Sequence, residues 1–85
     1  MDAEEPRYPD IYVQLTGEDS NTGSIMGRVI RALEEHAEYD EESNVYWLEG
    51  RNLNEVKAEF RSAIFFDAGS YDEVLRTVAE WVEVG

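Results

Sequence analysis

The residues of this chain that could do chemistry are mostly carboxylates, and they are densest in one run. Six of the nine residues from Glu34 to Glu42 are acidic. Carboxylates can serve as an acid–base pair, as metal ligands or as a docking surface for a cationic partner. No pair in the run stands apart from its neighbours as an acid–base couple, so the pattern favours a docking surface. The acids assigned to it are Glu34, Glu35, Glu38, Asp40, Glu41 and Glu42.

Other catalytic and ligand-binding chemistry has little support in the sequence. The chain has no cysteine, which excludes thiolate metal sites and a cysteine nucleophile, and its one histidine is His36. We expect His36 on the surface, near a helix C-terminus that favours a cation. Residues 17–24 lack the Gly-Lys-Ser/Thr ending of a phosphate-binding loop, and residues 19–22 lack the register of a calcium-binding loop. We therefore expect no catalytic residue, no metal and no cofactor, and a protein that is not an enzyme.

The charge of the whole chain points to a basic partner. Seven basic and twenty acidic residues give a net charge of −13, which disfavours direct binding to nucleic acid and to anionic membranes. On a helix, Glu34 and Glu38 would lie one turn apart, about 5–6 Å. That spacing resembles the phosphate repeat of a nucleic-acid strand. We therefore expect the partner to be a basic, nucleic-acid-binding protein whose binding groove the acids occupy.

The negative charge is also compatible with two roles that need no acidic docking site. A net charge far from zero keeps a small domain soluble, and the protein would then be an accessory or housekeeping protein. A proteome adapted to high salt also uses many acids and few lysines. In this chain Lys57 is the only lysine beside six arginines. The sequence carries no signal for an oligomeric state.

Three amphipathic helices and two strands are expected to position these residues. The helices are predicted from apolar residues at i, i+3, i+4 and i+7 spacing, and two of them also from a capping box at their start. They are expected over residues 22–38, 53–66 and 71–82. The strands are predicted from alternation and from β-branched and aromatic residues. They are expected over residues 10–16 and 45–49, joined to the neighbouring helices by polar connections such as 38–44, with residues 82–85 as an alternative short strand.

The expected fold is one small α+β domain over residues 10–85, in the order β-α-β-α-α, with a short antiparallel sheet packed on helices. Residues 1–9 are expected to be a flexible tail. No apolar run is long enough to span a bilayer and no secretory signal is present, so we expect a cytoplasmic protein. One core is expected from the apolar face of each element. Its members are Ile11, Val13, Leu15, Val29, Ile30, Leu33, Val56, Phe60, Val74, Leu75, Val78 and Trp81.

Two pairs of adjacent aromatic residues are candidates for exposure. Tyr46 and Trp47 are neighbours in a predicted strand, so their rings point to opposite faces and one of them is expected to face solvent. An exposed ring beside acids can anchor a partner. Tyr46 and Trp47 therefore join the acidic run as predicted partner-binding residues. Phe65 and Phe66 cannot share one direction either, so one of them is expected to be exposed.

Several segments resemble a family of short proteins of actinobacteria and their phages. The resemblance is carried by residues 10–19 (Asp-Ile-Tyr-Val-Gln-Leu-Thr-Gly-Glu-Asp), 27–29 (Gly-Arg-Val) and 81–84 (Trp-Val-Glu-Val), with further agreement at 32–33, 59–60 and 69–72. The chain departs from the family at 22–24 and at 38–52. The second segment reads as an insertion that holds four of the six acids of the predicted docking surface and the Tyr46–Trp47 pair. The resemblance carries no chemistry to transfer, but it implies a phage or mobile-element setting. In that setting an acidic DNA mimic would inhibit a defence system such as CRISPR or restriction.

Overall fold

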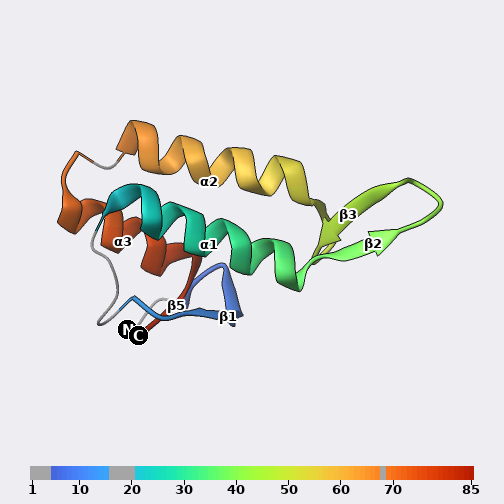
Figure 1. The fold of residues 1–85 in the computed structure, drawn as a ribbon, viewed down its shortest axis with the longest axis horizontal. Coiled ribbons are helices and arrows are strands. Elements are labelled where there is room, and N and C mark those ends of the chain that lie inside the picture. Colours follow the sequence, from blue (N-terminus) through green and yellow to red (C-terminus); the bar gives the residue numbers. More distant parts are fainter. Residues whose placement is uncertain (1–4, 16–20, 68) are drawn as a thin grey trace.

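The computed structural model describes residues 5–15, 21–67 and 69–85, and within these ranges the chain forms three helices and five short strands (Figure 1). The helices are α1 (Thr22–His36), α2 (Leu53–Asp67) and α3 (Tyr71–Trp81). The strands are β1 (Tyr8–Val13), β2 (Glu38–Asp40), β3 (Val45–Leu48), β4 (Arg51–Asn52) and β5 (Val82–Val84). The expected α+β class is confirmed, and the order β-α-β-α-α holds for the larger elements.

Polar side chains fix where the helices begin. The Asn21 side chain accepts hydrogen bonds from two N–H groups in the first turn of α1, at 2.8 and 3.3 Å. Before α3, Ser70 Oγ accepts from the Glu73 N–H at 3.3 Å. The Glu73 carboxylate reaches back to the Gly69 N–H at 3.0 Å. The capping pattern in the sequence therefore marks the start of α3 correctly.

The ends of α1 and α3 differ from the expected ones. Helix α1 ends at His36 rather than at residue 38, because Ala37 has an extended backbone (φ −79°, ψ 152°) and Glu38 already belongs to β2. His36 is exposed at the end of α1, as expected. Helix α3 ends at Trp81, and β5 is the short strand that the sequence offered as the alternative.

The first strand begins earlier than predicted and shortens the tail. β1 starts at Tyr8 instead of residue 10, and the predicted end of that strand, Thr16, lies outside the described residues. Tyr8 is only 6% exposed, and the Arg7 N–H donates to the Glu80 carbonyl at 2.9 Å. Pro9 suggested a tail, but proline is tolerated where a strand has a free edge, and among the described strands β1 pairs only with β5.

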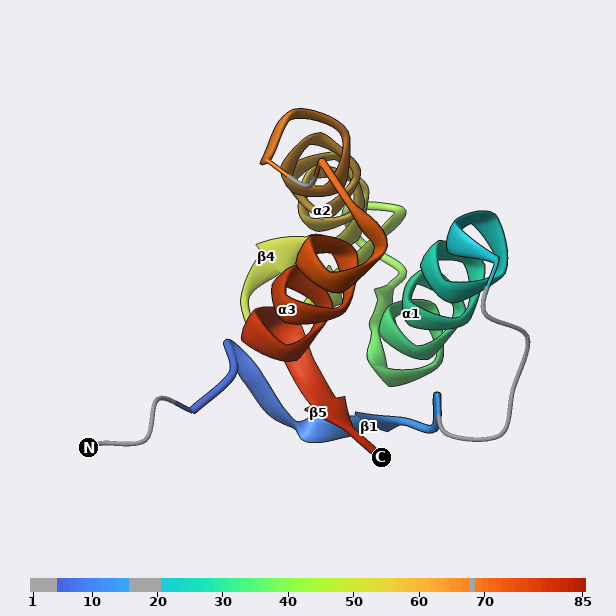
Figure 2. The same ribbon diagram turned by 90° about the vertical axis from the view of Figure 1, so that its left-hand side faces the viewer.

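Two small sheets flank the helices. β1 and β5 pair in parallel, and Figure 2 shows the three helices on one side of that pair. β2, β3 and β4 form an antiparallel sheet. Between β3 and β4 the two-residue turn Glu49–Gly50 has φ values of 49° and 84°. Both residues are left-handed, as a type I′ hairpin turn requires.

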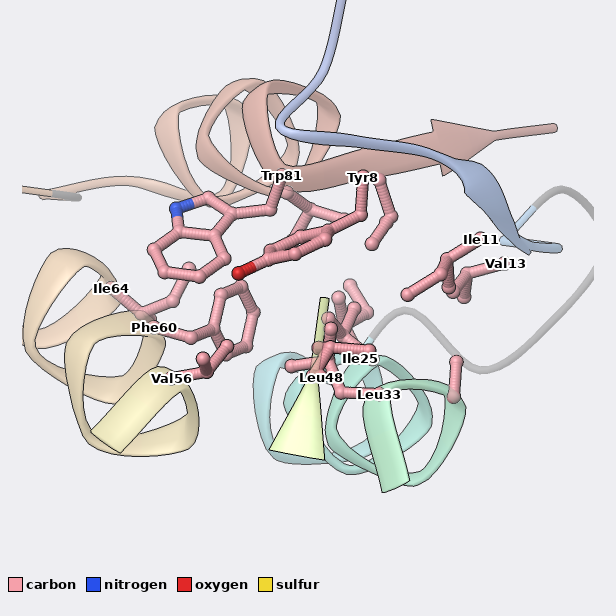
Figure 3. Close-up of a cluster of buried hydrophobic side chains, with 14 of the residues drawn as sticks. Tyr8, Ile11, Val13, Ile25, Leu33, Leu48, Val56, Phe60, Ile64 and Trp81 are labelled. Carbon is pink, nitrogen blue, oxygen red and sulfur yellow. The ribbon is translucent and has the colours of Figure 1, made fainter. Parts of the chain in front are cut away.

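One apolar core joins the helices to β1 and β5 (Figure 3). Nine of the twelve expected core residues are buried, while Leu15, Ile30 and Leu75 are only partly buried at its edge. At the centre, the Phe60 ring meets the Trp81 ring edge to face, with centroids 5.4 Å apart. Other buried members lie outside the expected set. They are Tyr8, Ile25, Ala32, Leu48, Leu53, Ile64 and Val82.

Candidate protein-docking hairpin

Residues 38–48 form a β-hairpin, here called the acidic hairpin, that projects beyond the helices at one end of the molecule (Figure 1). Its tip is the turn 41–44, where the Asn44 N–H donates to the Asp40 carbonyl at 2.8 Å and Asn44 has φ 57°. The sequence predicted a polar connection over residues 38–44. That prediction is wrong for residues 38–40, which form β2. Acidic residues are depleted in strands. In β2 they are accommodated because the aromatic residues of β3 supply cross-strand contacts that stabilise the pairing of the two strands.

The two faces of the acidic hairpin carry different side chains. Directly opposed residues in an antiparallel pair share a face, and the register pairs Glu38 with Trp47 and Tyr39 with Tyr46. Trp47 therefore lies on the same face as Glu38 and Asp40. Tyr39 and Tyr46 form the other face, with ring centroids 5.0 Å apart.

Both members of the Tyr46–Trp47 pair are exposed, by 51% and 36%. The expectation that only one would face solvent is wrong, because the projecting hairpin leaves both faces of β3 open to solvent at these two positions. Tyr39, which is 49% exposed, is a third aromatic that the sequence reasoning missed. The turn residues 40–44 lie between Tyr39, which is aromatic, and Val45, which is β-branched. This pattern is a hairpin signal that could have identified the strand that carries Tyr39.

Hydrogen bonds within the acidic hairpin hold its aromatic rings in place. Trp47 Nε1 donates to Ser43 Oγ at 3.2 Å, and Ser43 Oγ donates to Asp40 Oδ2 at 2.9 Å. On the opposite face the Tyr39 hydroxyl donates to Asn44 Oδ1. Rings fixed in this way lose little conformational entropy when a partner covers them.

The six acids of the predicted site fall into two groups. Glu34 and Glu35 lie at the end of α1, whereas the other four belong to the acidic hairpin. The expected helical spacing of Glu34 and Glu38 is wrong, because the helix ends between them. Glu34 also has an internal partner, since Lys57 Nζ lies 2.9 Å from its Oε2. The hydrogen bond from Lys57, together with its charge, lowers the pKa of Glu34.

Within the acidic hairpin, Asp40 differs from the other acids. It is half-buried, and its Oδ1 accepts the Glu42 N–H at 3.1 Å while its Oδ2 accepts Ser43 Oγ. Asp40 therefore holds the turn, and its place in the predicted partner-binding site stays a prediction. Glu38, Glu41 and Glu42 are exposed. Among the described residues, no Lys or Arg forms an ion pair with these three carboxylates.

A hollow of about 490 Å³ lies between the acidic hairpin and the helices. Tyr46 lines it from β3, Leu53 and Lys57 from α2, and Glu34 from α1. The two charged residues that line this hollow, Glu34 and Lys57, form an ion pair with each other. Across the described ranges, no group of three His, Asp or Glu side chains is placed to hold a metal ion. In the same ranges, no helix is long and apolar enough to cross a membrane.

The acidic hairpin is the feature that best fits the predicted partner-binding site, and relatives add nothing to its interpretation. No protein-family model, curated protein or solved structure matches this chain. The resemblance to short actinobacterial and phage proteins therefore stays a prediction.

Proposed function

We propose that this protein is a non-catalytic binding protein whose acidic hairpin docks on the basic surface of a nucleic-acid-binding protein. The observation that carries the proposal is the exposed indole of Trp47, held by Ser43 on the same face as Glu38 and Asp40. A projecting ring beside the Glu38 carboxylate, with which no described Lys or Arg pairs, has no role in the core of this domain. It is the arrangement that an anchor for a cationic surface needs.

Charge and aromatic surface contribute different things to such a contact. The carboxylates of Glu38, Glu41 and Glu42 would steer a basic partner toward the acidic hairpin and raise the association rate. The Trp47 ring would provide affinity, because an Arg guanidinium over an indole face gains a cation–π attraction. Together they present a stacking surface beside negative charges, the two features that a nucleic-acid strand offers to its binding groove.

In a phage or mobile element, as the resemblance implies, occupying such a groove would inhibit a defence system such as CRISPR or restriction. The protein would then act in the cytoplasm of the host cell. It would bind the protein rather than its nucleic acid, since the net charge of −13 repels phosphates.

The test compares two variants that remove the same charge from different places. In the hairpin variant Glu38, Glu41 and Glu42 become Gln, and Asp40 is kept because it holds the turn. The matched control carries Gln at three exposed acids elsewhere, Glu55, Glu80 and Glu83.

Both variants, a Trp47→Ala variant and the unaltered chain are used to capture proteins from an actinobacterial lysate. A captured protein is then titrated with a DNA duplex and this protein in competition. We expect the control to bind, the hairpin variant and Trp47→Ala to lose most binding, and DNA to displace the unaltered chain. Equal binding of the hairpin variant and its control would leave the acids with a solubilising role only. Simultaneous binding of DNA and protein would rule out mimicry.

A further inference from the structure

The two halves of α2 have different surroundings. The C-terminal half ends with Phe65 and Phe66, which are 78% and 75% exposed, although only one of the two rings was expected to be. The N-terminal half lies next to the acidic hairpin and carries Lys57 and Glu59 (Figure 1). Positions two apart on a helix differ by about 200°, so these two residues lie on either side of the buried Phe60. They therefore leave α2 in different directions.

Each of these two charges pairs with a residue at the base of one strand of the acidic hairpin. Lys57 Nζ lies 2.9 Å from Oε2 of Glu34, in the last turn of α1, from which the chain enters β2. Glu59 accepts both arms of Arg51, through Nη1 at 3.0 Å and through Nη2. Arg51 belongs to β4 and is paired with Leu48, the last residue of β3. These two ion pairs, Glu34–Lys57 and Arg51–Glu59, are here called the root clamp.

The geometry of the root clamp distinguishes it from ordinary surface ion pairs. Exposed pairs contribute little on average, but a bidentate Arg–carboxylate pair such as Arg51–Glu59 is an exception. The Lys57 side chain is only 17% exposed, and charges that are partly withdrawn from water attract each other more strongly. Hydrogen bonds from Lys57 and Arg51 lower the pKa values of Glu34 and Glu59. Both carboxylates therefore stay charged at neutral pH.

Beyond its base, the acidic hairpin has room to move. Leu48 is buried, whereas the preceding Tyr46 and Trp47 are open to solvent, so the packed part of β3 begins at Leu48. The hollow of about 490 Å³ separates the acidic hairpin from the helices on the side that Tyr46 lines. From Leu48 to Asn44 the strand runs roughly 13 Å. A rotation of about 20° at Leu48 would therefore move the tip by roughly 4–5 Å.

We propose that the root clamp is a positioning device, which holds the acidic hairpin in one direction and whose release lets the hairpin rotate about Leu48. In this role Glu34 acts through Lys57, and Glu59 acts through Arg51. The consequence for docking rests on the proposed function. A hairpin that already points in one direction meets a basic partner without the entropic cost of ordering it.

Distances between two spin labels in the full chain test the root clamp. The chain has no cysteine, so Glu42→Cys at the hairpin tip and Ser62→Cys on α2, both at exposed positions, give two unique labels. Double electron–electron resonance then measures the distribution of distances between them. We expect a narrow distribution when the root clamp is intact. In Glu34→Gln/Glu59→Gln the distribution should be wider by roughly 4–5 Å.

The matched control removes the same charge from the same two helices. Glu35→Gln/Glu55→Gln changes exposed acids that form no ion pair with a described Lys or Arg, and it should keep the narrow distribution. In Glu34→Lys/Lys57→Glu the two charges exchange places and can pair again, so the distribution should stay narrow. A loss of packing at these positions would not be reversed by that exchange.

Sodium chloride gives a readout that needs no variant of the root clamp. The Debye length falls to about 3 Å at 1 M salt, so the labelled chain with an intact clamp should approach the wide distribution of Glu34→Gln/Glu59→Gln, which itself should not change. Equal distributions in that variant and its control overturn the proposal, as does a charge-exchange variant with the wide distribution. The distances are measured in the free protein. A lysate that yields no partner would therefore overturn the docking proposal and leave the root clamp standing.

Discussion

Replacing Phe60 with alanine tests the core directly, and the same helix supplies the control. Phe60 is fully buried and packs edge to face against Trp81, 5.4 Å away, whose ring also lies 6.1 Å from that of Tyr8. Truncation removes that aromatic contact and leaves a cavity between α2, α3 and β1. Substitutions of this kind cost about 3–5 kcal/mol. A chain of 85 residues has a total stability of roughly 4–13 kcal/mol, so Phe60→Ala should remove a large part of it.

The assay is urea and thermal unfolding followed by circular dichroism. For a cost of about 4 kcal/mol the melting temperature should fall by roughly 16–32 °C. Phe65→Ala removes the same ring from a site that is 78% exposed, and it should change stability by less than about 0.5 kcal/mol. If the two variants lose similar stability, or if Phe60→Ala costs less than about 1 kcal/mol, α2 does not bury the face described above.

Three further predictions concern charge and turns. The melting temperature at neutral pH should rise between about 0.05 and about 1 M sodium chloride, because salt screens the −13 charge; a flat or falling value contradicts this, and unfolding at low salt would favour salt adaptation. The unaltered chain should be more stable than Glu34→Gln, and this difference in unfolding free energy should be largest at pH values above the ordinary glutamate pKa, where the Lys57 pair is intact. The difference should vanish as pH falls through the pKa of Glu34 in the folded state, which is lowered. Urea titrations across pH measure that difference, and a value independent of pH speaks against the ion pair. Gly50→Ala should destabilise by about 1–2 kcal/mol because its φ is 84°, whereas Glu49→Asn should stabilise the same turn; equal unfolding midpoints for both variants would be inconsistent with a left-handed turn.

Local periodicity was enough to predict the helices and most of the core. The i, i+4 rows such as Val29–Leu33 and Val74–Val78 are buried as their spacing requires. The pairing of β1 with β5 was out of reach, because Tyr8 and Val82 are 82 − 8 = 74 residues apart and no local pattern encodes such a partner.

The candidate site was predictable in composition but not in geometry. The alternation of β3 correctly placed Tyr46 and Trp47 on opposite faces. It could not show that the hairpin projects, which depends on the packing of the helices and exposes both rings. The Glu34–Lys57 ion pair joins two helices, and the turn contacts of Asp40 depend on a β2 strand too short to show periodicity. One tertiary contact, at Glu34, and one set of local turn contacts, at Asp40, therefore decide which acids remain available.

The parallel pairing of β1 with β5 has a consequence for how the chain folds as it is synthesised. The partner of β1 is translated 74 residues after Tyr8, and Trp81, which completes the aromatic cluster around Phe60, immediately precedes it. Until these residues leave the ribosome exit tunnel, Tyr8 and Ile11 have no strand to pair with and the nascent helices lack part of their apolar cover. A loop of this length also costs entropy to close. Folding of the domain is therefore expected to finish only after β5 has left the tunnel, with a window in which the unfinished domain depends on chaperones or is open to proteolysis.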